Sequence, residues 1–394
     1  MVCIDELGLR LDALAVFEEL KEDEAIRRLR QFLAEPSAAA YAAFAAALYR
    51  ANGGCLSAYV REISETCPTP YARRKAWGKP VEPCLQAALD RELETLQAVA
   101  DLTPEALTGR LPHSHGLPGF TGGGVRIAEN YYAHVERIHQ CGYGLYAQHY
   151  AFFVDDSGRI APVRRPDATR LCDLFGYTQQ RQQVIRNTRA FLAGRPASHV
   201  CLTGDAGTGK SATVKALVNE YGGEGLRILE VRKDQVACLP RLMDELADQP
   251  LKFIVFLDDL SFREDDDVFN GFKAILEGSV AANPANVLIY ATSNRRHIIR
   301  ETFSERDGDE IHRNDAMQET ASLSERFGLR VTFGKPDKKT YLAIVTHLAE
   351  QAGLTVDEQM CIEAERFALN KTGRSARAAR QFVDQLLSAP HDEP

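Results

Sequence analysis

The sequence GDAGTGKS, residues 204–211, decides the fold class predicted for this chain. It fits the pattern G-x-x-x-x-G-K-[ST] in full, with the strand-like segment HVCLT before it and the helix-like segment SATVKALVNEY after it. Its glycines let the backbone bend so that N–H groups face phosphate oxygens, and the positive end of the following helix adds to that field. We therefore expect a phosphate-binding loop made of Gly204, Asp205, Ala206, Gly207, Thr208, Gly209, Lys210, Ser211 and Ala212.

Two side chains of this loop, and a second stretch of sequence, predict that the ligand is ATP with Mg²⁺. Lys210 can reach the β- and γ-phosphates, and Ser211 can offer its hydroxyl to magnesium. The stretch FIVFLDDLSF, residues 253–262, is typical of a buried strand that ends in two acids. We expect Asp258 to hold the magnesium through water, and Asp259 to orient or deprotonate the attacking water.

The second acid leaves two interpretations open. Asp259 is one methylene shorter than the glutamate that most such ATPases carry. The site could hydrolyse ATP as a variant of a working site, or hydrolyse it slowly while ATP acts as a conformational switch. A third polar residue, Asn294, ends the strand-like segment NVLIYATSN. We expect it to lie between the two earlier strand ends and to hydrogen-bond the lytic water or the γ-phosphate.

The pattern along the chain predicts three domains. Residues 1–165 are expected to form a mostly helical domain that ends in a hairpin, with a proline-rich loop over residues 66–83. Residues 166–336 alternate strand-like and helix-like segments, which predicts an α/β domain with a parallel sheet flanked by helices. Residues 337–394 are typical of a helical C-terminal domain.

Composition excludes several classes of protein. The net charge of −8 gives nucleic acid no bulk attraction, and the apolar runs are too short to cross a membrane. The N-terminus lacks the basic start of a signal peptide, so we expect a cytoplasmic protein. The nine cysteines include no CxxC, which suits reduced thiols better than disulfides or a zinc site.

Several motifs together resemble the AAA+ ATPases. LSERFGLRVTF (323–333) is similar to the segment that ends in an arginine finger, at Arg326, and SARAARQFVDQ (375–385) is similar to the sensor 2 helix of the lid. The sensor 2 residue would be Arg377, although Arg374 lies within one helical turn of it. Residues 173–194 resemble the stretch that cups adenine in many members of that superfamily. The resemblance implies a P-loop NTPase fold with a C-terminal helical lid.

A closer resemblance is to a bacterial family of predicted AAA+ ATPases known as domain-of-unknown-function family 815. FLAGRPASHVCLTGDAGTGKS, FLDDLSFREDDD and VLIYATSNRRHIIRE are similar to its sequence blocks. In AAA+ rings the finger points into the neighbour's site, so Arg326 implies a homo-oligomer, as a ring or an open spiral, that hydrolyses ATP at subunit interfaces. The expected role is to remodel or load a macromolecular partner, either protein or nucleic acid, that is held by the N-terminal domain.

Other segments of the sequence argue for or against particular versions of this role. The segment VRKDQVACLPR lacks the aromatic and glycine residues of peptide-threading loops, which argues against protein unfolding. A replication-accessory ATPase stays an alternative, although we expect no DNA-binding domain after the lid. The basic segment RRHIIRE (295–301) could contact phosphates, but a solvated face is the simpler interpretation. The aromatic residues between 131 and 153 are expected to form domain core and not to stack bases.

Overall fold

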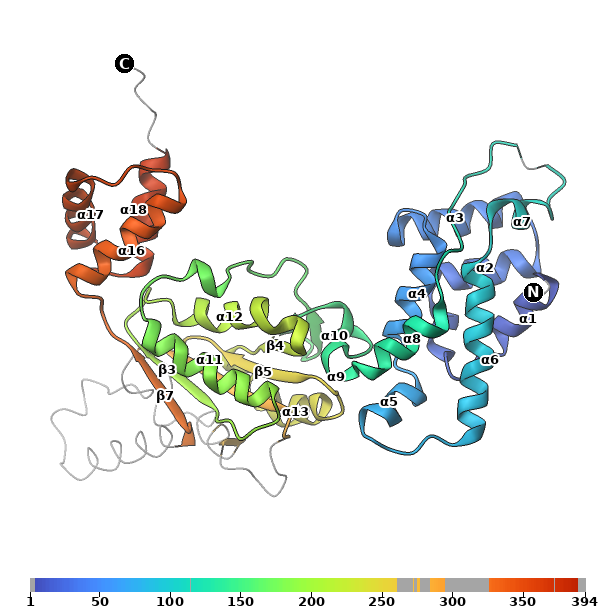
Figure 1. Ribbon diagram of the computed structural model, residues 1–394, viewed down its shortest axis with the longest axis horizontal. Coiled ribbons are helices and arrows are strands. Elements are labelled where there is room, and N and C mark those ends of the chain that lie inside the picture. Colours follow the sequence, from blue (N-terminus) through green and yellow to red (C-terminus); the bar gives the residue numbers. More distant parts are fainter. Residues whose placement is uncertain are drawn as a thin grey trace, which may run out of the picture. The chain divides into compact units, whose positions relative to one another are not determined.

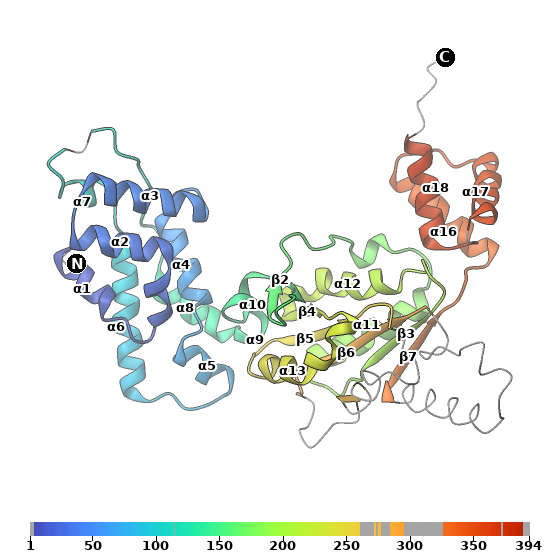
Figure 2. The same ribbon diagram turned by 180° about the vertical axis from the view of Figure 1, so that it is seen from behind.

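The computed structural model describes residues 4–113, 115–260, 272, 275–276, 284–294, 326–371 and 373–388. These residues form two compact units, Met1–Gln148 and His149–Pro394, which we describe separately as unit 1 and unit 2. Figures 1 and 2 show the two units in ribbon form. No described helix is both long and apolar enough to span a membrane.

The regular elements of unit 1, in its described part, are helices, apart from one isolated bridge between Cys55 and Thr121. Its helices pack around one buried core, to which nearly every helix contributes leucine and aromatic side chains. They are α1 (Ile4–Asp12), η1 (Glu18–Glu22), α2 (Glu24–Ala34), α3 (Ala38–Asn52), α4 (Leu56–Thr66), α5 (Pro70–Ala76), α6 (Pro83–Ala100), α7 (Pro104–Thr108), α8 (Ile127–Glu136), α9 (Ile138–Cys141) and α10 (Leu145–Gln148).

Helix boundaries in unit 1 follow capping signals in the sequence. The Ser37 hydroxyl accepts a backbone N–H at the start of α3, and Gly53, with φ +78°, ends that helix in the left-handed region. Thr69 caps α5, whose first residue is Pro70. Proline fits this position because its missing N–H has no partner within a helix. The stretch 66–83 therefore contains a helix where the sequence predicted only a loop.

A buried carboxylate fixes the chain between α1 and η1. Glu92, on α6, accepts the backbone N–H groups of Ala15 (2.8 Å), Val16 (3.0 Å) and Phe17 (2.9 Å). These three groups form no helical hydrogen bonds, so the carboxylate satisfies donors that burial would otherwise leave unpaired. The aromatic stretch has the expected core role in part: Tyr131, Tyr143 and Tyr146 are buried in unit 1, whereas Tyr150 and Phe153 of unit 2 are exposed.

Unit 2 is built on one mixed sheet. Its described strands follow the order β2-β1-β4-β5-β6-β3-β7, and all neighbours are parallel except β1 and β2. The strands are β1 (Ala151–Val154), β2 (Ile160–Pro162), β3 (Val200–Gly204), β4 (Leu226–Glu230), β5 (Lys252–Leu257), β6 (Val287–Ser293) and β7 (Leu329–Phe333).

Helices cover both faces of this sheet. Helices α11 (Thr178–Leu192) and α12 (Lys210–Tyr221) share a core with alternate residues of the strands, among them Ile254 and Phe256 of β5. The intervening side chains of β5 point to the other face, where α13 (Leu239–Ala247) lies (Figures 1 and 2). The predicted parallel sheet with helices on both faces is confirmed.

The predicted boundary between the first two domains requires correction. The expected hairpin is present, but it does not close unit 1. Its first strand pairs in parallel with β4, with Phe152 opposite Leu229, so the hairpin extends the sheet of unit 2. The boundary between the two units along the chain therefore falls between Gln148 and His149, and not at residue 165. The physical reason is that β4 would otherwise leave a row of backbone groups unpaired at the sheet edge.

Three helices follow the sheet and form the lid. They are α16 (Lys338–Gln351), α17 (Glu358–Asn370) and α18 (Ala376–Ser388), which share a small apolar core. Asp337 caps α16 and Asp357 caps α17, each through its carboxylate. The predicted helical character of the chain after residue 337 is thus confirmed as far as residue 388.

Candidate nucleotide-binding site

The glycines of the loop between β3 and α12 are required by its geometry. Gly204 has φ +130°, and a Cβ there would lie 2.0 Å from the carbonyl oxygen of Phe333 on β7. Gly207 and Gly209, with φ of +77° and +91°, also adopt left-handed conformations, and Gly209 forms the N-cap of α12. The backbone conformation is therefore one that side chains at these positions would strain or block.

Lys210 is buried at the centre of the loop. Its Nζ donates to the carbonyl oxygens of Gly204 (2.8 Å) and Asp205 (2.8 Å) and to Oδ1 of Asn294 (3.0 Å). Burial lowers the pKa of Lys210, while the nearby carboxylates, including Asp258, act in the opposite direction. All three ammonium hydrogens are thus engaged, two by carbonyl oxygens of the loop and one by Asn294.

The two predicted magnesium ligands lie together. Ser211 Oγ donates to Asp258 Oδ1 at 2.6 Å, and the same carboxylate oxygen accepts the hydroxyl of Thr292 at 2.6 Å. The backbone N–H of Asp259 adds a third contact to Oδ1 at 3.1 Å. A hydroxyl and a carboxylate are the hard oxygen donors that Mg²⁺ prefers, so these residues fit that ion.

The second acid is held by the residue predicted to sense the nucleotide. Asn294 Nδ2 donates to Asp259 Oδ1 at 2.6 Å, while the other atom of the same amide accepts from Lys210. Asp259 has φ +52°, which is the left-handed region that only a few non-glycine residues occupy. Since β6 lies between β5 and β3, Asn294 lies between the two other strand ends, as predicted.

The start of the last lid helix contacts the phosphate-binding loop. The backbone N–H of Arg377 donates to the carbonyl oxygen of Gly207 at 3.1 Å. Arg374 instead pairs with Glu365 of α17, with its Nε 2.9 Å from Oε1. This hydrogen bond raises the pKa of Arg374 and lowers that of Glu365. The structure therefore brings Arg377, and not Arg374, to the loop.

The segment before α11 also contacts the lid. The ring of Phe175 stacks on His347 of α16, with centroids 4.6 Å apart, and Tyr177 donates its hydroxyl to the carbonyl of Gly334 at 2.8 Å. Burial raises the pKa of Tyr177 to about 12. Phe175 and Tyr177, near the start of the stretch 173–194 that was expected to cup adenine, thus contact the lid and the residue that follows β7.

Some of the predicted residues lie at the edge of the described part of the chain or outside it. Arg326 is half-buried just before β7, and the segments 295–325 and 261–271 lie outside the described residues. The basic segment 295–301 and the acidic residues 263–267 fall in these gaps. Two features of the site were not predicted. Thr292 had no signal beyond its place two residues before Asn294, and no pattern in the sequence indicates the stacking of Phe175 on His347.

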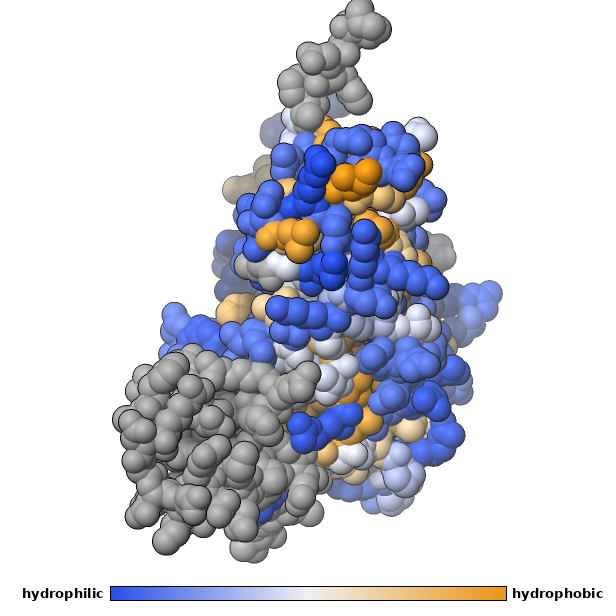
Figure 3. Space-filling model, turned by 90° about the vertical axis from the view of Figure 1, so that its left-hand side faces the viewer, coloured by the Kyte–Doolittle hydropathy of each residue, from blue (hydrophilic) through white to orange (hydrophobic). Residues whose placement is uncertain are grey.

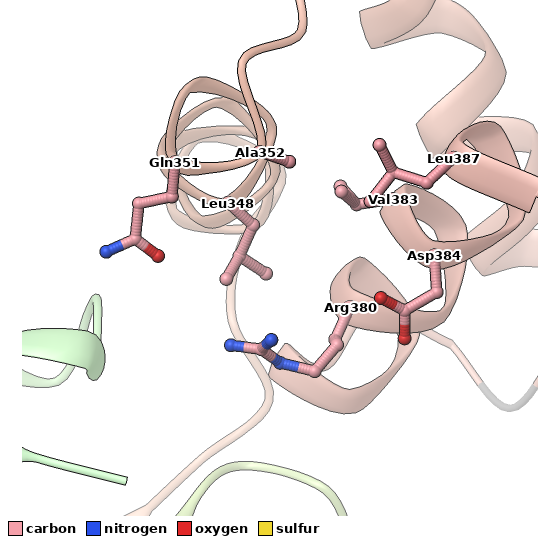
Figure 4. A pocket seen from close by; sticks show the side chains of 7 residues that line it. All are labelled: Leu348, Gln351, Ala352, Arg380, Val383, Asp384 and Leu387. Atoms are coloured by element: carbon pink, nitrogen blue, oxygen red, sulfur yellow. The ribbon is translucent and has the colours of Figure 1, made fainter.

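A second concave region lies in the lid. A cavity of about 180 Å³ opens between α16 and α18, where Arg380 and Asp384 flank an apolar floor (Figure 4). Pockets that hold a nucleotide-sized ligand are larger, at about 300 Å³ or more. Its lining residues are Leu348, Gln351, Ala352, Arg380, Val383, Asp384 and Leu387.

The rest of the described surface offers no metal site. No group of three or more metal-ligating His, Cys, Asp or Glu side chains occurs among the residues that the structure describes. The face seen in Figure 3 is mainly hydrophilic, with apolar side chains scattered over the lid at the top of the view. Exposed apolar residues of the lid include Ile362 and Leu369.

Among the described residues, the loop after β3 and the ends of β5 and β6 form the strongest candidate site.

Comparison with protein families agrees with this site. A family model described as a protein of unknown function, DUF815, matches residues 147–389. The chain belongs to the DUF815 family. The match begins two residues before the start of unit 2, so it covers the sheet, the loop and the lid of this DUF815 protein. No curated protein matches the chain.

Solved structures similar to this DUF815 protein include the RuvB Holliday junction branch migration motor of Thermotoga maritima. The match has a TM-score of 0.39 and 13% sequence identity, and it covers 56% of this chain and 64% of the RuvB chain. A single-residue variant of RuvB matches with 14% identity and the same TM-score. The α/β fold of the DUF815 chain is seen in its own strand order and phosphate-binding loop.

Proposed function

We propose that this DUF815 protein binds ATP with Mg²⁺ and hydrolyses it. The observation that carries the proposal is the set of hydrogen bonds that joins the loop to both acids, to Asp258 through Ser211 and to Asp259 through Lys210 and Asn294. Lys210 contacts Asn294, and Asn294 contacts Asp259. The phosphate-binding loop, the expected metal ligands and the expected base thus occupy one continuous site at the carboxyl ends of three adjacent parallel strands.

Each residue has a role that its surroundings support. The loop N–H groups and Lys210 bind the phosphates, and Ser211 with Asp258 would hold the metal ion. Mg²⁺, when bound, neutralises charge on the β- and γ-phosphate oxygens. Asp259 accepts the proton of the attacking water, and Asn294 orients that water or the γ-phosphate. Arg377 extends from the lid helix that already contacts Gly207.

The proposal includes a homo-oligomer in which Arg326 acts as the arginine finger of a neighbouring subunit. An arginine finger accelerates hydrolysis by about 10³- to 10⁵-fold. Turnover per subunit should therefore rise with protein concentration, and Arg326→Ala should abolish it without weakening nucleotide binding. The partner that the oligomer remodels or loads, whether protein or nucleic acid, would be held by unit 1.

A test of hydrolysis itself uses the full chain and measures phosphate release together with binding of a fluorescent ATP analogue. Lys210→Ala should lose binding, whereas Asp259→Asn should keep binding and lose turnover. Full turnover in Asp259→Asn would refute the role of this acid. Absence of phosphate release from the assembled wild-type protein would refute hydrolysis.

A second candidate function is a nucleotide-gated switch with slow hydrolysis. It is favoured by the short second acid, whose Oδ1 is engaged by Asn294. Single-turnover measurements separate the two functions. Release of γ-phosphate over many minutes from the assembled protein would favour the switch, while release within seconds would favour the hydrolytic motor.

A further inference from the structure

One residue of β6 contacts all three residues of the turn that follows β5. Thr292 is 1% exposed, and its Oγ1 donates to Asp258 Oδ1 at 2.6 Å. The same oxygen accepts the backbone N–H of Asp259 at 2.9 Å. The backbone carbonyl of Thr292 accepts the N–H of Leu260 at 2.7 Å. Thr292 therefore fixes the turn through both its side chain and its main chain.

The turn needs such support because Asp259 lies in the left-handed region, at φ +52°. A non-glycine residue occupies that region at an energetic cost and stays there only when its surroundings hold it. The N–H of Asp259 supplies this restraint because it donates to both Thr292 Oγ1 and Asp258 Oδ1. In this conformation the Asp259 carboxylate meets Asn294.

The same hydroxyl sets the orientation of the first acid. A threonine hydroxyl has one hydrogen, and Thr292 gives it to Asp258 Oδ1. Ser211 and the Asp259 N–H donate to that oxygen as well. Among the described residues no hydrogen bond reaches Oδ2, so one oxygen of Asp258 is fixed and the other is open to a ligand.

We infer that Thr292 is a positioning residue for both acids of the site. It holds Asp259 in the left-handed conformation that compensates for its short side chain, and it leaves Oδ2 of Asp258 available to the metal ion. Thr292 acts only through Asp258 and Asp259. The expected loss of kcat rests on the proposed ATPase function. The expected effect on the conformation of Asp258 and Asp259 does not.

The test compares Thr292→Val, which keeps the shape and loses the hydroxyl, with Thr292→Ser, which keeps the hydroxyl. The matched control is Thr203→Val, because Thr203 is an equally buried threonine on the neighbouring β3 whose hydroxyl bonds Thr332 at 3.1 Å. Four quantities are measured on the full chain. They are the kcat for ATP, metal-free binding of a fluorescent ATP analogue, Mn²⁺ binding with ATP by electron paramagnetic resonance, and amide exchange at residues 259 and 260.

In Thr292→Val we expect kcat and Mn²⁺ affinity to fall about 10- to 100-fold, the usual effect of losing a hydrogen bond that orients a metal ligand. Metal-free nucleotide affinity should stay within about two-fold, since only the acids are affected. Amide exchange at Asp259 and Leu260 should accelerate. Thr292→Ser and Thr203→Val should resemble the wild type.

Three outcomes would overturn the inference: wild-type Mn²⁺ binding and exchange in Thr292→Val, equal losses in Thr292→Ser and Thr292→Val, or the same losses in Thr203→Val. A wild-type protein without turnover would refute the proposed hydrolysis. The Mn²⁺ and exchange measurements would still decide the role of Thr292, so the two failures are distinguishable.

Discussion

At the scale of single residues, the state of Lys210 links nucleotide binding to pH. Burial lowers the pKa of this side chain in the free site, and phosphate oxygens would raise it again because they favour the charged form. Only the protonated lysine binds phosphate well. ATP affinity should therefore be constant below the lowered pKa of the free site and should decrease as pH rises through it, at a pH below the ordinary range for lysine.

Titration of the Kd for a fluorescent ATP analogue between pH 7 and 10 measures this effect. Lys210→Arg is the matched control, because its guanidinium stays charged throughout that range. The variant should bind more weakly at pH 7 but lose the pH dependence. A wild-type Kd that does not change up to pH 10, or an equal pH dependence in Lys210→Arg, would contradict the prediction.

Glu92 provides a prediction about stability. Glu92→Ala should destabilise unit 1 by at least about 3 kcal/mol, because the N–H groups at residues 15 to 17 would lose a charged acceptor. Unfolding can be followed by the fluorescence of Trp77, the single tryptophan of the chain, which lies in unit 1. The control is Glu94→Ala, an exposed glutamate of the same helix. Equal effects of the two substitutions would refute this account of Glu92.

The residues of the site differ in how far the sequence could predict them. The roles proposed for Lys210, Ser211 and Asp258 follow from residue type and spacing, and the structure places Ser211 in contact with Asp258. Thr292 could not be found in this way, since buried threonines are ordinary in strands. Its significance depends on the strand order that places β6 beside β5, and on the conformation of Asp259, neither of which a local pattern contains.

At the scale of elements, the start of α18 distinguishes two neighbouring arginines. Arg374 is engaged by Glu365, whereas the backbone of Arg377 contacts the phosphate-binding loop. Arg377→Gln should lower kcat by about 10-fold or more while the thermal stability of the protein stays close to that of the wild type. Arg374→Gln should have the opposite profile, with a lower melting temperature and nearly unchanged kcat.

Steady-state kinetics and thermal unfolding of the two variants check this assignment. Glu365→Gln is an additional control, because it removes the partner of Arg374 and should reproduce the Arg374→Gln profile. A loss of kcat in Arg374→Gln as large as that in Arg377→Gln would contradict the assignment of sensor 2 to Arg377.

Elements were predicted best where one local rule decides them. Alternation of apolar segments was enough for the parallel sheet and for the lid. The short helix α5 was missed because prolines were interpreted as loop residues, although Pro70 is compatible with the first turn of a helix. The partner of the β1–β2 hairpin was also missed, since pairing between β1 and β4 joins residues distant in the sequence.

At the scale of the whole molecule, the corrected boundary predicts which fragment folds. A fragment of residues 149–394 keeps β1 on the edge of β4 and should be monodisperse, with the ATP affinity of the full chain. A fragment of residues 166–394 lacks the hairpin and exposes that edge, so it should aggregate or melt at a lower temperature. Light scattering, thermal unfolding and nucleotide binding compare the two. Equal behaviour would show that the hairpin is dispensable.

The short outer strand of that hairpin has a consequence for how the protein behaves at high concentration. Strand β2 comprises only Ile160–Pro162, and its last residue has no N–H to donate. An incoming strand from another molecule would find too few backbone groups there to extend the sheet. On this side the sheet is therefore protected against edge-to-edge aggregation, which would let many copies be concentrated without forming intermolecular β-structure at that edge.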